Sequence, residues 1–122
     1  MKKRILVVDD QPAMRFIIRS MIETSKSNYD VSEAENGEIA FELIKLIEFD
    51  LIITDVNMPK MGGVELAQKM ANQLIFSLFI FMSADDFSLR KISAMDLIGF
   101  SGAIEKPFDM KNFTKVIEKA LA

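Results

Sequence analysis

Five side chains that could carry out phosphate chemistry follow apolar runs of the sequence. Asp9 and Asp10 come directly after one run, Asp55 after a second, Ser83 after a third and Lys106 after a short fourth. If these runs are strands of one parallel sheet, the five side chains meet at its carboxyl edge, where open α/β sheets bind ligands. Three carboxylates, a hydroxyl and an ammonium group in one crevice are typical of a metal-dependent phosphate site.

The charges of this group predict a bound divalent cation. Three like charges so close together are unfavourable, and carboxylates would take up protons unless a cation lay among them. Mg²⁺ prefers oxygen ligands and keeps several waters, so one or two carboxylates suffice to bind it. Asp55 is the expected nucleophile, because carboxylates accept phosphoryl groups and a flexible loop over residues 58–63 leaves room for an incoming group.

Each of these residues, taken alone, has a simpler interpretation. A lone aspartate at a strand end, such as Asp9 or Asp10, usually caps the next helix. A lone Ser83 would serve in a turn, and a lone Lys106 would be solvated, as most lysines are. Only their common position at the ends of successive runs favours a shared site.

The hydrophobic pattern predicts five strands that alternate with five helices. Short apolar or alternating runs predict strands over residues 5–8, 31–34, 51–54, 78–82 and 99–104. Apolar residues at three-four spacing predict helices over residues 14–22, 40–47, 66–70, 89–95 and 113–121. This alternation indicates a parallel sheet with helices on both faces. The first, third and fourth strands are continuously apolar and should be central, with the other two at the edges.

Length and composition exclude several classes of protein and site. The 122 residues predict a single domain over 1–122. No cysteine is present, which excludes disulfides and thiolate metal sites and fits the cytoplasmic location that we expect. The net charge of -3, without a basic stripe, argues against direct nucleic-acid binding. No segment approaches the roughly 20 unbroken apolar residues that a membrane span requires.

Four short motifs, in order along the chain, identify a family. They are Val8-Asp9-Asp10, Asp55-Val56-Asn57-Met58-Pro59 with Met61-Gly62-Gly63, Met82-Ser83-Ala84, and Lys106-Pro107-Phe108. Along its whole length the chain resembles the receiver domains of two-component response regulators, in particular the chemotaxis-regulator type. The resemblance implies a flavodoxin-like α/β fold with strand order 2-1-3-4-5. It also implies a phosphorylation-dependent switch, whose only reactions are its own phosphotransfer and autodephosphorylation, rather than a turnover enzyme.

The resemblance assigns roles to the acidic residues. Asp55 would be the phosphoacceptor and would receive its phosphoryl group from a phosphohistidine on a sensor histidine kinase. Asp10 and Asp55 would bind Mg²⁺ directly, and Asp9 would help directly or through water. The backbone carbonyl of Asn57 would supply a further metal ligand.

Other residues would read out the phosphorylation. Ser83 would close onto the phosphoryl group and Lys106 would contact it, and the Lys106–Pro107 bond is often cis in relatives. The surface of the fourth helix, fifth strand and fifth helix would then change and meet an output partner or a second copy. Most relatives carry an aromatic residue where this chain has Ala103, so we expect output through the fourth helix or a nearby ring such as Phe100.

Two other classes of protein compete with this interpretation. A Mg²⁺-dependent phosphohydrolase could also use a strand-end aspartate nucleophile, but such enzymes typically carry a second acid two residues later, where this chain has Asn57. A pseudo-receiver that never takes phosphate usually lacks an acid or the lysine, and both are present here. The sequence fits a stand-alone regulator and one domain of a longer protein equally well.

Overall fold

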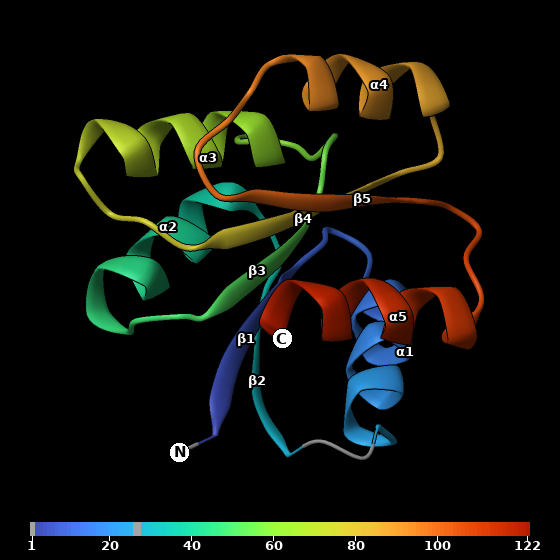
Figure 1. The fold of residues 1–122 in the computed structure, drawn as a ribbon. Coiled ribbons are helices and arrows are strands. Elements are labelled where there is room, and N and C mark those ends of the chain that lie inside the picture. Colours follow the sequence, from blue (N-terminus) through green and yellow to red (C-terminus); the bar gives the residue numbers. More distant parts are fainter. Residues whose placement is uncertain (1, 26–27) are drawn as a thin grey trace.

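A five-stranded sheet with helices on both faces forms the framework of the chain (Figure 1). The computed structural model describes residues 2–25 and 28–122. In chain order the elements are β1 (Lys3–Val8), α1 (Pro12–Glu23), β2 (Tyr29–Ala34), α2 (Gly37–Leu46), β3 (Leu51–Asp55), α3 (Gly63–Asn72), β4 (Leu78–Ser83), α4 (Asp86–Ala94), β5 (Phe100–Glu105) and α5 (Met110–Leu121). All strand pairs are parallel, in the order β2-β1-β3-β4-β5. The predicted fold and strand order are confirmed.

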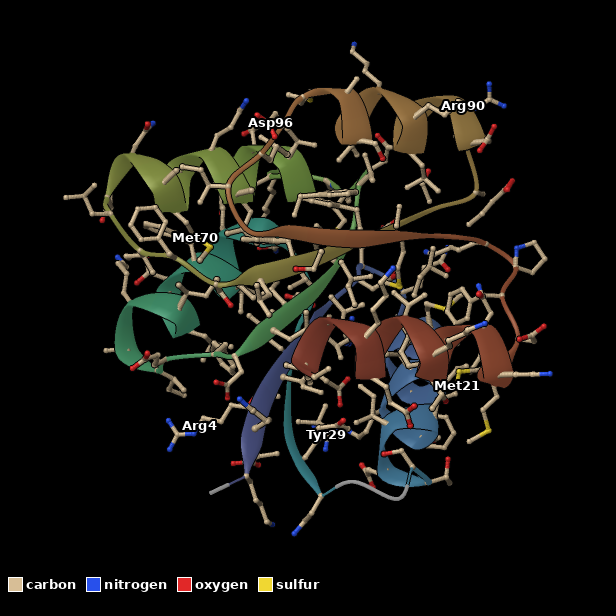
Figure 2. The ribbon with its side chains drawn as sticks, in the orientation of Figure 1. Arg4, Met21, Tyr29, Met70, Arg90 and Asp96 are labelled. Atoms are coloured by element: carbon tan, nitrogen blue, oxygen red, sulfur yellow. The ribbon has the colours of Figure 1, made fainter. Side chains whose placement is uncertain are left out.

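The continuous apolar runs of the central strands supply two cores. Successive strand residues point to opposite faces, so Leu6 and Val8 pack under α2, α3 and α4, whereas Ile5 and Val7 pack under α1 and α5. Figure 2 shows one methionine in each layer, Met70 of α3 and Met21 of α1. The strand ends that carry the polar residues are therefore held between two packed helical layers.

Capping residues define where two of the helices begin. The Asn36 side chain accepts a hydrogen bond from the Ile39 N–H and starts α2. The Asp109 side chain accepts one from the Asn112 N–H at 2.7 Å and starts α5. In the part of the chain that the structure describes, no helix combines the length and apolar character needed to cross a membrane.

Two residues of the predicted helical stripes are exposed instead of buried. Ile17 in α1 is 44% exposed, and Met95 is 40% exposed. Neighbouring residues on a helix point about 100° apart, so Ile17 turns aside when Ile18 faces the sheet. Met95 lies beyond the end of α4, which stops at Ala94.

Candidate metal and phosphate site

The carboxyl ends of four strands bring all five predicted side chains to one edge of the sheet. Asp9 and Asp10 follow β1, Asp55 ends β3, Ser83 ends β4 and Lys106 follows β5. Because the strands are parallel and paired as far as their carboxyl ends, these ends lie within about two residues of one another, although the β4–β5 register shifts between Phe79 and Ile80. The five side chains therefore meet at the carboxyl edge of the sheet, as the positions of the apolar runs predicted.

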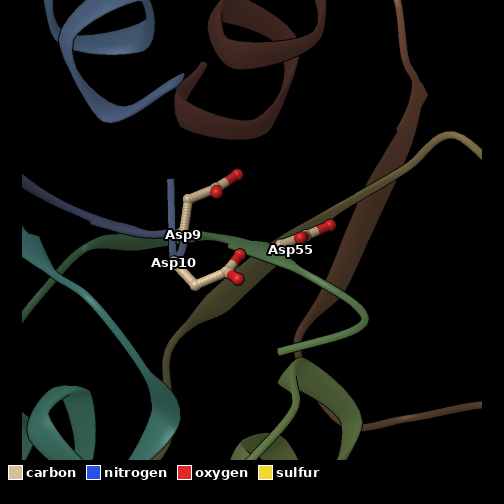
Figure 3. Close-up of side chains that lie close together, drawn as sticks. All are labelled: Asp9, Asp10 and Asp55. Carbon is tan, nitrogen blue, oxygen red and sulfur yellow. The ribbon is translucent and has the colours of Figure 1, made fainter. Parts of the chain in front are cut away.

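Three carboxylates gather at the centre of this edge (Figure 3). Asp9, Asp10 and Asp55 each offer one oxygen, and these oxygens lie within 4.8 Å of one another. Asp9 is completely buried, Asp10 is exposed, and the Asp55 side chain is 14% exposed. The cluster therefore extends from the buried core at Asp9 to the solvent at Asp10.

Lys106 brings the one ammonium group that pairs with this cluster among the described residues. Its Nζ lies 3.0 Å from Asp9 Oδ2 and 3.4 Å from Asp55 Oδ1. Its backbone N–H donates to the Ser83 carbonyl at 2.8 Å, which ties the end of β5 to the end of β4. The Lys106–Pro107 bond is cis, as the family resemblance implied.

Asp9 and Asp10 differ in the freedom of their oxygens. Asp9 Oδ1 accepts from the Gln11 N–H at 2.9 Å and Oδ2 accepts from Lys106. Neither aspartate caps the next helix, because the N-cap residue of α1 is Gln11 and, among the described residues, no side chain caps this helix. Within residues 2–25 and 28–122, the Asp10 carboxylate has no hydrogen-bond or ion-pair partner. Asp10 is therefore the acid whose oxygens are open to a metal.

The environment of Asp55 favours a nearby cation. Burial raises the pKa of Asp55 above its ordinary value. The Lys106 charge opposes this rise in pKa, the Asp9 carboxylate adds to it, and the Val56 N–H, at 3.1 Å from Oδ1, opposes it. A divalent ion among the three acids would stabilise the ionised form in the same way as Lys106 does.

Ser83 is buried at the end of β4, next to the strand of Asp55. Its hydroxyl oxygen accepts from the Asp85 N–H at 3.0 Å, so the turn role expected of a lone serine is also present. Since a hydroxyl can accept and donate at once, this bond leaves the Ser83 hydrogen free for another acceptor. No hydrogen bond joins Ser83 to Asp55 in the described structure.

Backbone contacts attach the loop after Asp55 to neighbouring elements. The Gly63 N–H donates to the Val56 carbonyl, and the Gly37 N–H donates to the Met61 carbonyl, both at 3.1 Å. A Cβ atom at Gly37 would lie 2.6 Å from the Met61 oxygen, and one at Gly63 would lie 2.6 Å from the Asp55 oxygen. Close backbone contacts therefore anchor the loop against β3 and α2, and its predicted flexibility stays a prediction.

Sequence reasoning missed one residue that touches the site. Arg15 of α1 donates from Nη1 to the Asp9 carbonyl at 2.7 Å and from Nε to Glu33 of β2 at 3.2 Å. An arginine on an amphipathic helix is normally solvated, so its residue type and spacing carried no signal of this contact.

The comparisons with known proteins agree with this geometry. A family model for the response regulator receiver domain matches residues 5–118. The chain belongs to this family. Receiver domains are signalling switches of two-component systems and not turnover enzymes, and nothing in the comparisons favours a phosphohydrolase or a pseudo-receiver.

Several receiver proteins are similar to the chain. It is 30% identical over 121 residues to the transcriptional regulatory protein PhoP of Bacillus subtilis, covering 99% of this chain but 49% of PhoP. It is 30% identical to the chemotaxis protein CheY-3 of Vibrio cholerae, covering 95% of this chain and 89% of that protein. The receiver thus corresponds to about half of PhoP and most of CheY-3.

A solved structure provides a match in three dimensions. The response regulator TrrA of Thermotoga maritima, in complex with Mg(2+)-BeF, superposes with a TM-score of 0.83 at 27% identity. The alignment covers 97% of this chain and 98% of TrrA. The arrangement of strands and helices is therefore shared along nearly the whole receiver.

Proposed function

We propose that Asp55 accepts a phosphoryl group from a phosphohistidine on a sensor histidine kinase. The observation that carries this proposal is the sharing of Lys106 between Asp9 and Asp55, inside a cluster of three carboxylates. That arrangement concentrates opposite charges where a phosphoryl group would add negative charge. Asp55 is the acid of the three that ends a central strand and lies partly open to solvent.

The donor set fits Mg²⁺, which takes oxygen ligands and retains several waters. Asp10 and Asp55 would bind the ion directly, and the Asn57 carbonyl would add a backbone ligand. Asp9 would help directly or through water, and each of its oxygens already accepts one protein hydrogen bond. When bound, Mg²⁺ would neutralise charge on the phosphoryl group.

The transfer needs little chemistry from the protein beyond positioning. An Asp55 oxygen attacks phosphorus as the phosphorus–nitrogen bond of the donor breaks, and the electron pair of that bond stays with the imidazole. Lys106 stabilises a phosphoryl oxygen from the β5 side. Ser83 donates its free hydroxyl hydrogen to a second oxygen, and hydrolysis of the acyl phosphate later resets the switch.

The readout passes through the β4–α4 side of the molecule. Movement of Ser83 toward the phosphoryl group would shift the loop over residues 84–85, which leads directly into α4. The surface of α4, β5 and α5 would then bind an output protein, an output domain or a second copy of the chain. We further propose that the domain acts in the cytoplasm, without contacting nucleic acid or membrane.

Labelling with a small acyl phosphate tests the assignment of Asp55. Acetyl phosphate should label the wild type in the presence of Mg²⁺, whereas Asp55→Asn should take no label. Asp109→Asn is the matched control, because Asp109 is exposed and asparagine caps helices as well as aspartate does. Undiminished labelling of Asp55→Asn, or labelling that persists in excess chelator, would contradict the proposal.

A further inference from the structure

Arg15 holds the peptide group that joins two acids of the site. Its Nη1 donates to the backbone carbonyl of Asp9 at 2.7 Å, which is a short, charge-assisted hydrogen bond. That carbonyl belongs to the peptide group that links Asp9 to Asp10. Its orientation therefore also sets the position from which the Asp10 side chain projects. The Arg15 side chain is 17% exposed, and the contact is therefore largely shielded from water.

Glu33 of β2 fixes the guanidinium group in turn. Glu33 Oε1 accepts from Arg15 Nε at 3.2 Å, and Oε2 accepts from Arg19 Nε at 2.7 Å. Arg19 also donates from Nη2 to the Val31 carbonyl at 3.0 Å. Because several donors of each planar guanidinium are used at once, the positions of the two arginines are well defined.

Asp10 depends on this support more than the other two acids. The Asp9 and Asp55 carboxylates are both held by Lys106 and by backbone N–H groups. Asp10 is exposed, and among the described residues its carboxylate has no partner. Its position relative to the cluster is therefore set through the backbone alone.

We infer that Arg15 is a positioning residue for the metal site. By fixing the peptide between Asp9 and Asp10, it keeps the Asp10 carboxylate beside Asp55 before any ion binds. Since Arg15 donates to a carbonyl and not to a carboxylate, it leaves the Asp10 oxygens free. This inference rests on the proposed function, because it assumes that these acids bind Mg²⁺.

Arg19 provides a matched control for Arg15. Both arginines lie on α1, carry the same charge and pair with the same Glu33. The other contacts of Arg19 go to the Val31 carbonyl and to Glu23, away from the acids. Arg15→Gln and Arg19→Gln therefore both remove an ion pair with Glu33, but only the first releases the Asp9 carbonyl.

Calorimetric titration with Mg²⁺ alone, together with denaturation, separates positioning from stability. Arg15→Gln should weaken Mg²⁺ binding by about tenfold, as is typical when a residue that orients a metal ligand is lost. Arg19→Gln should change it by less than about threefold, because a partly exposed ion pair contributes little. Arg15→Lys should bind Mg²⁺ with intermediate affinity, since lysine can reach a carbonyl but cannot also keep the Glu33 bond.

Equal Mg²⁺ affinities for Arg15→Gln and Arg19→Gln would overturn the inference. If Arg15→Gln does not fold, Arg15→Lys against Arg19→Lys makes the same comparison, and equal affinities of that pair would also overturn it. Labelling with acetyl phosphate at saturating Mg²⁺ should proceed in Arg15→Gln at nearly the wild-type maximal rate, with only the half-saturating Mg²⁺ concentration raised. Failure of the wild type to label would refute the proposed function, while the Mg²⁺ titrations would still decide the role of Arg15.

Discussion

The Lys106 ammonium group donates to the completely buried Asp9 carboxylate at 3.0 Å, although 97 positions separate the two residues in sequence. This ion pair closes the sheet edge by joining the chain after β5 to the chain after β1. It also means that the lysine expected to contact phosphate already stabilises a buried charge in the unphosphorylated domain. Lys106 therefore contributes to folding as well as to the site.

Replacing Lys106 should destabilise the fold. In Lys106→Gln the buried Asp9 carboxylate loses its cation, and removing one partner of a buried pair is costly. Because Lys106 is 15% exposed, we expect the free energy of unfolding to fall by about 2 kcal/mol, less than for a fully buried pair. Chemical denaturation at neutral pH without Mg²⁺ measures this, and Lys111→Gln on the exposed face of α5 is the control. Equal free energies of unfolding for Lys106→Gln and Lys111→Gln would show that Lys106 does not stabilise the buried Asp9 carboxylate.

Asp55 should give the stability a characteristic dependence on pH. Burial raises its pKa in the folded state, so the folded domain binds this proton more tightly than the unfolded chain does. The contribution of Asp55 to stability is therefore highest below about pH 4, the ordinary carboxyl range, and is lost as pH rises through the raised pKa.

A non-titrating variant isolates this effect. In the presence of chelator, Asp55→Asn should gain stability relative to the wild type as pH rises through that window, and the difference should then level off. Added Mg²⁺ should narrow the difference in stability at neutral pH, because the ion should bind the wild-type site, with its three carboxylates, more tightly than the variant site with two. Denaturation curves between acid and neutral pH measure both effects, and a difference that stays constant with pH would contradict the assignment.

The stacked rings beside α4 should carry the switch in place of the missing aromatic residue. Ala103 lies opposite Phe81 in the β4–β5 register, and Phe81 is two residues before Ser83. The Phe81 ring is buried and stacks on Phe79 and Phe100, with centroids 5.6 Å and 6.1 Å apart. A shift of Ser83 can therefore reach the start of β5 through ring packing.

Phe100→Leu should weaken this coupling by about 1 kcal/mol without abolishing phosphorylation. The measurement is the change in amide hydrogen exchange of α4 and β5 when Mg²⁺ and beryllofluoride, a phosphate mimic, are added. Phe76→Leu is the control, because Phe76 is 56% exposed in the α3–β4 connection, at the opposite edge of the sheet from Asp55. An unchanged response in Phe100→Leu would exclude the ring stack from the readout.

The fold and the acidic cluster could be predicted because each depends on a repeating local pattern. The unbroken apolar character of β1, β3 and β4 reflects burial on both faces, and the polar residue after each strand marks the shared edge. Parallel pairing then fixes which ends meet. The resemblance to receiver domains added roles for Asp10, Asn57 and Ser83, and these roles remain predictions.

What escaped prediction depends on contacts between distant residues. The Arg15–Asp9 bond and the Arg15–Glu33 pair join α1 to β1 and β2 through side-chain geometry, which leaves no trace in hydrophobic spacing. The exposure of Ile17 depends on how α1 rotates over the sheet. The attachment of the loop after Asp55 to α2 depends on the contact between Gly37 and Met61, which are far apart in sequence.

The contact between Gly37 and Met61 bears on which part of the domain can move after phosphorylation. The backbone of α2 meets the loop after Asp55 so closely that not even a methyl group fits at Gly37. If a phosphoryl group is added to Asp55, we expect little movement toward α2, because this contact leaves no free space there. We expect the adjustment to occur on the opposite flank, where Ala84 is exposed before α4. A partner that senses the modified domain should accordingly approach from α4 rather than from α2.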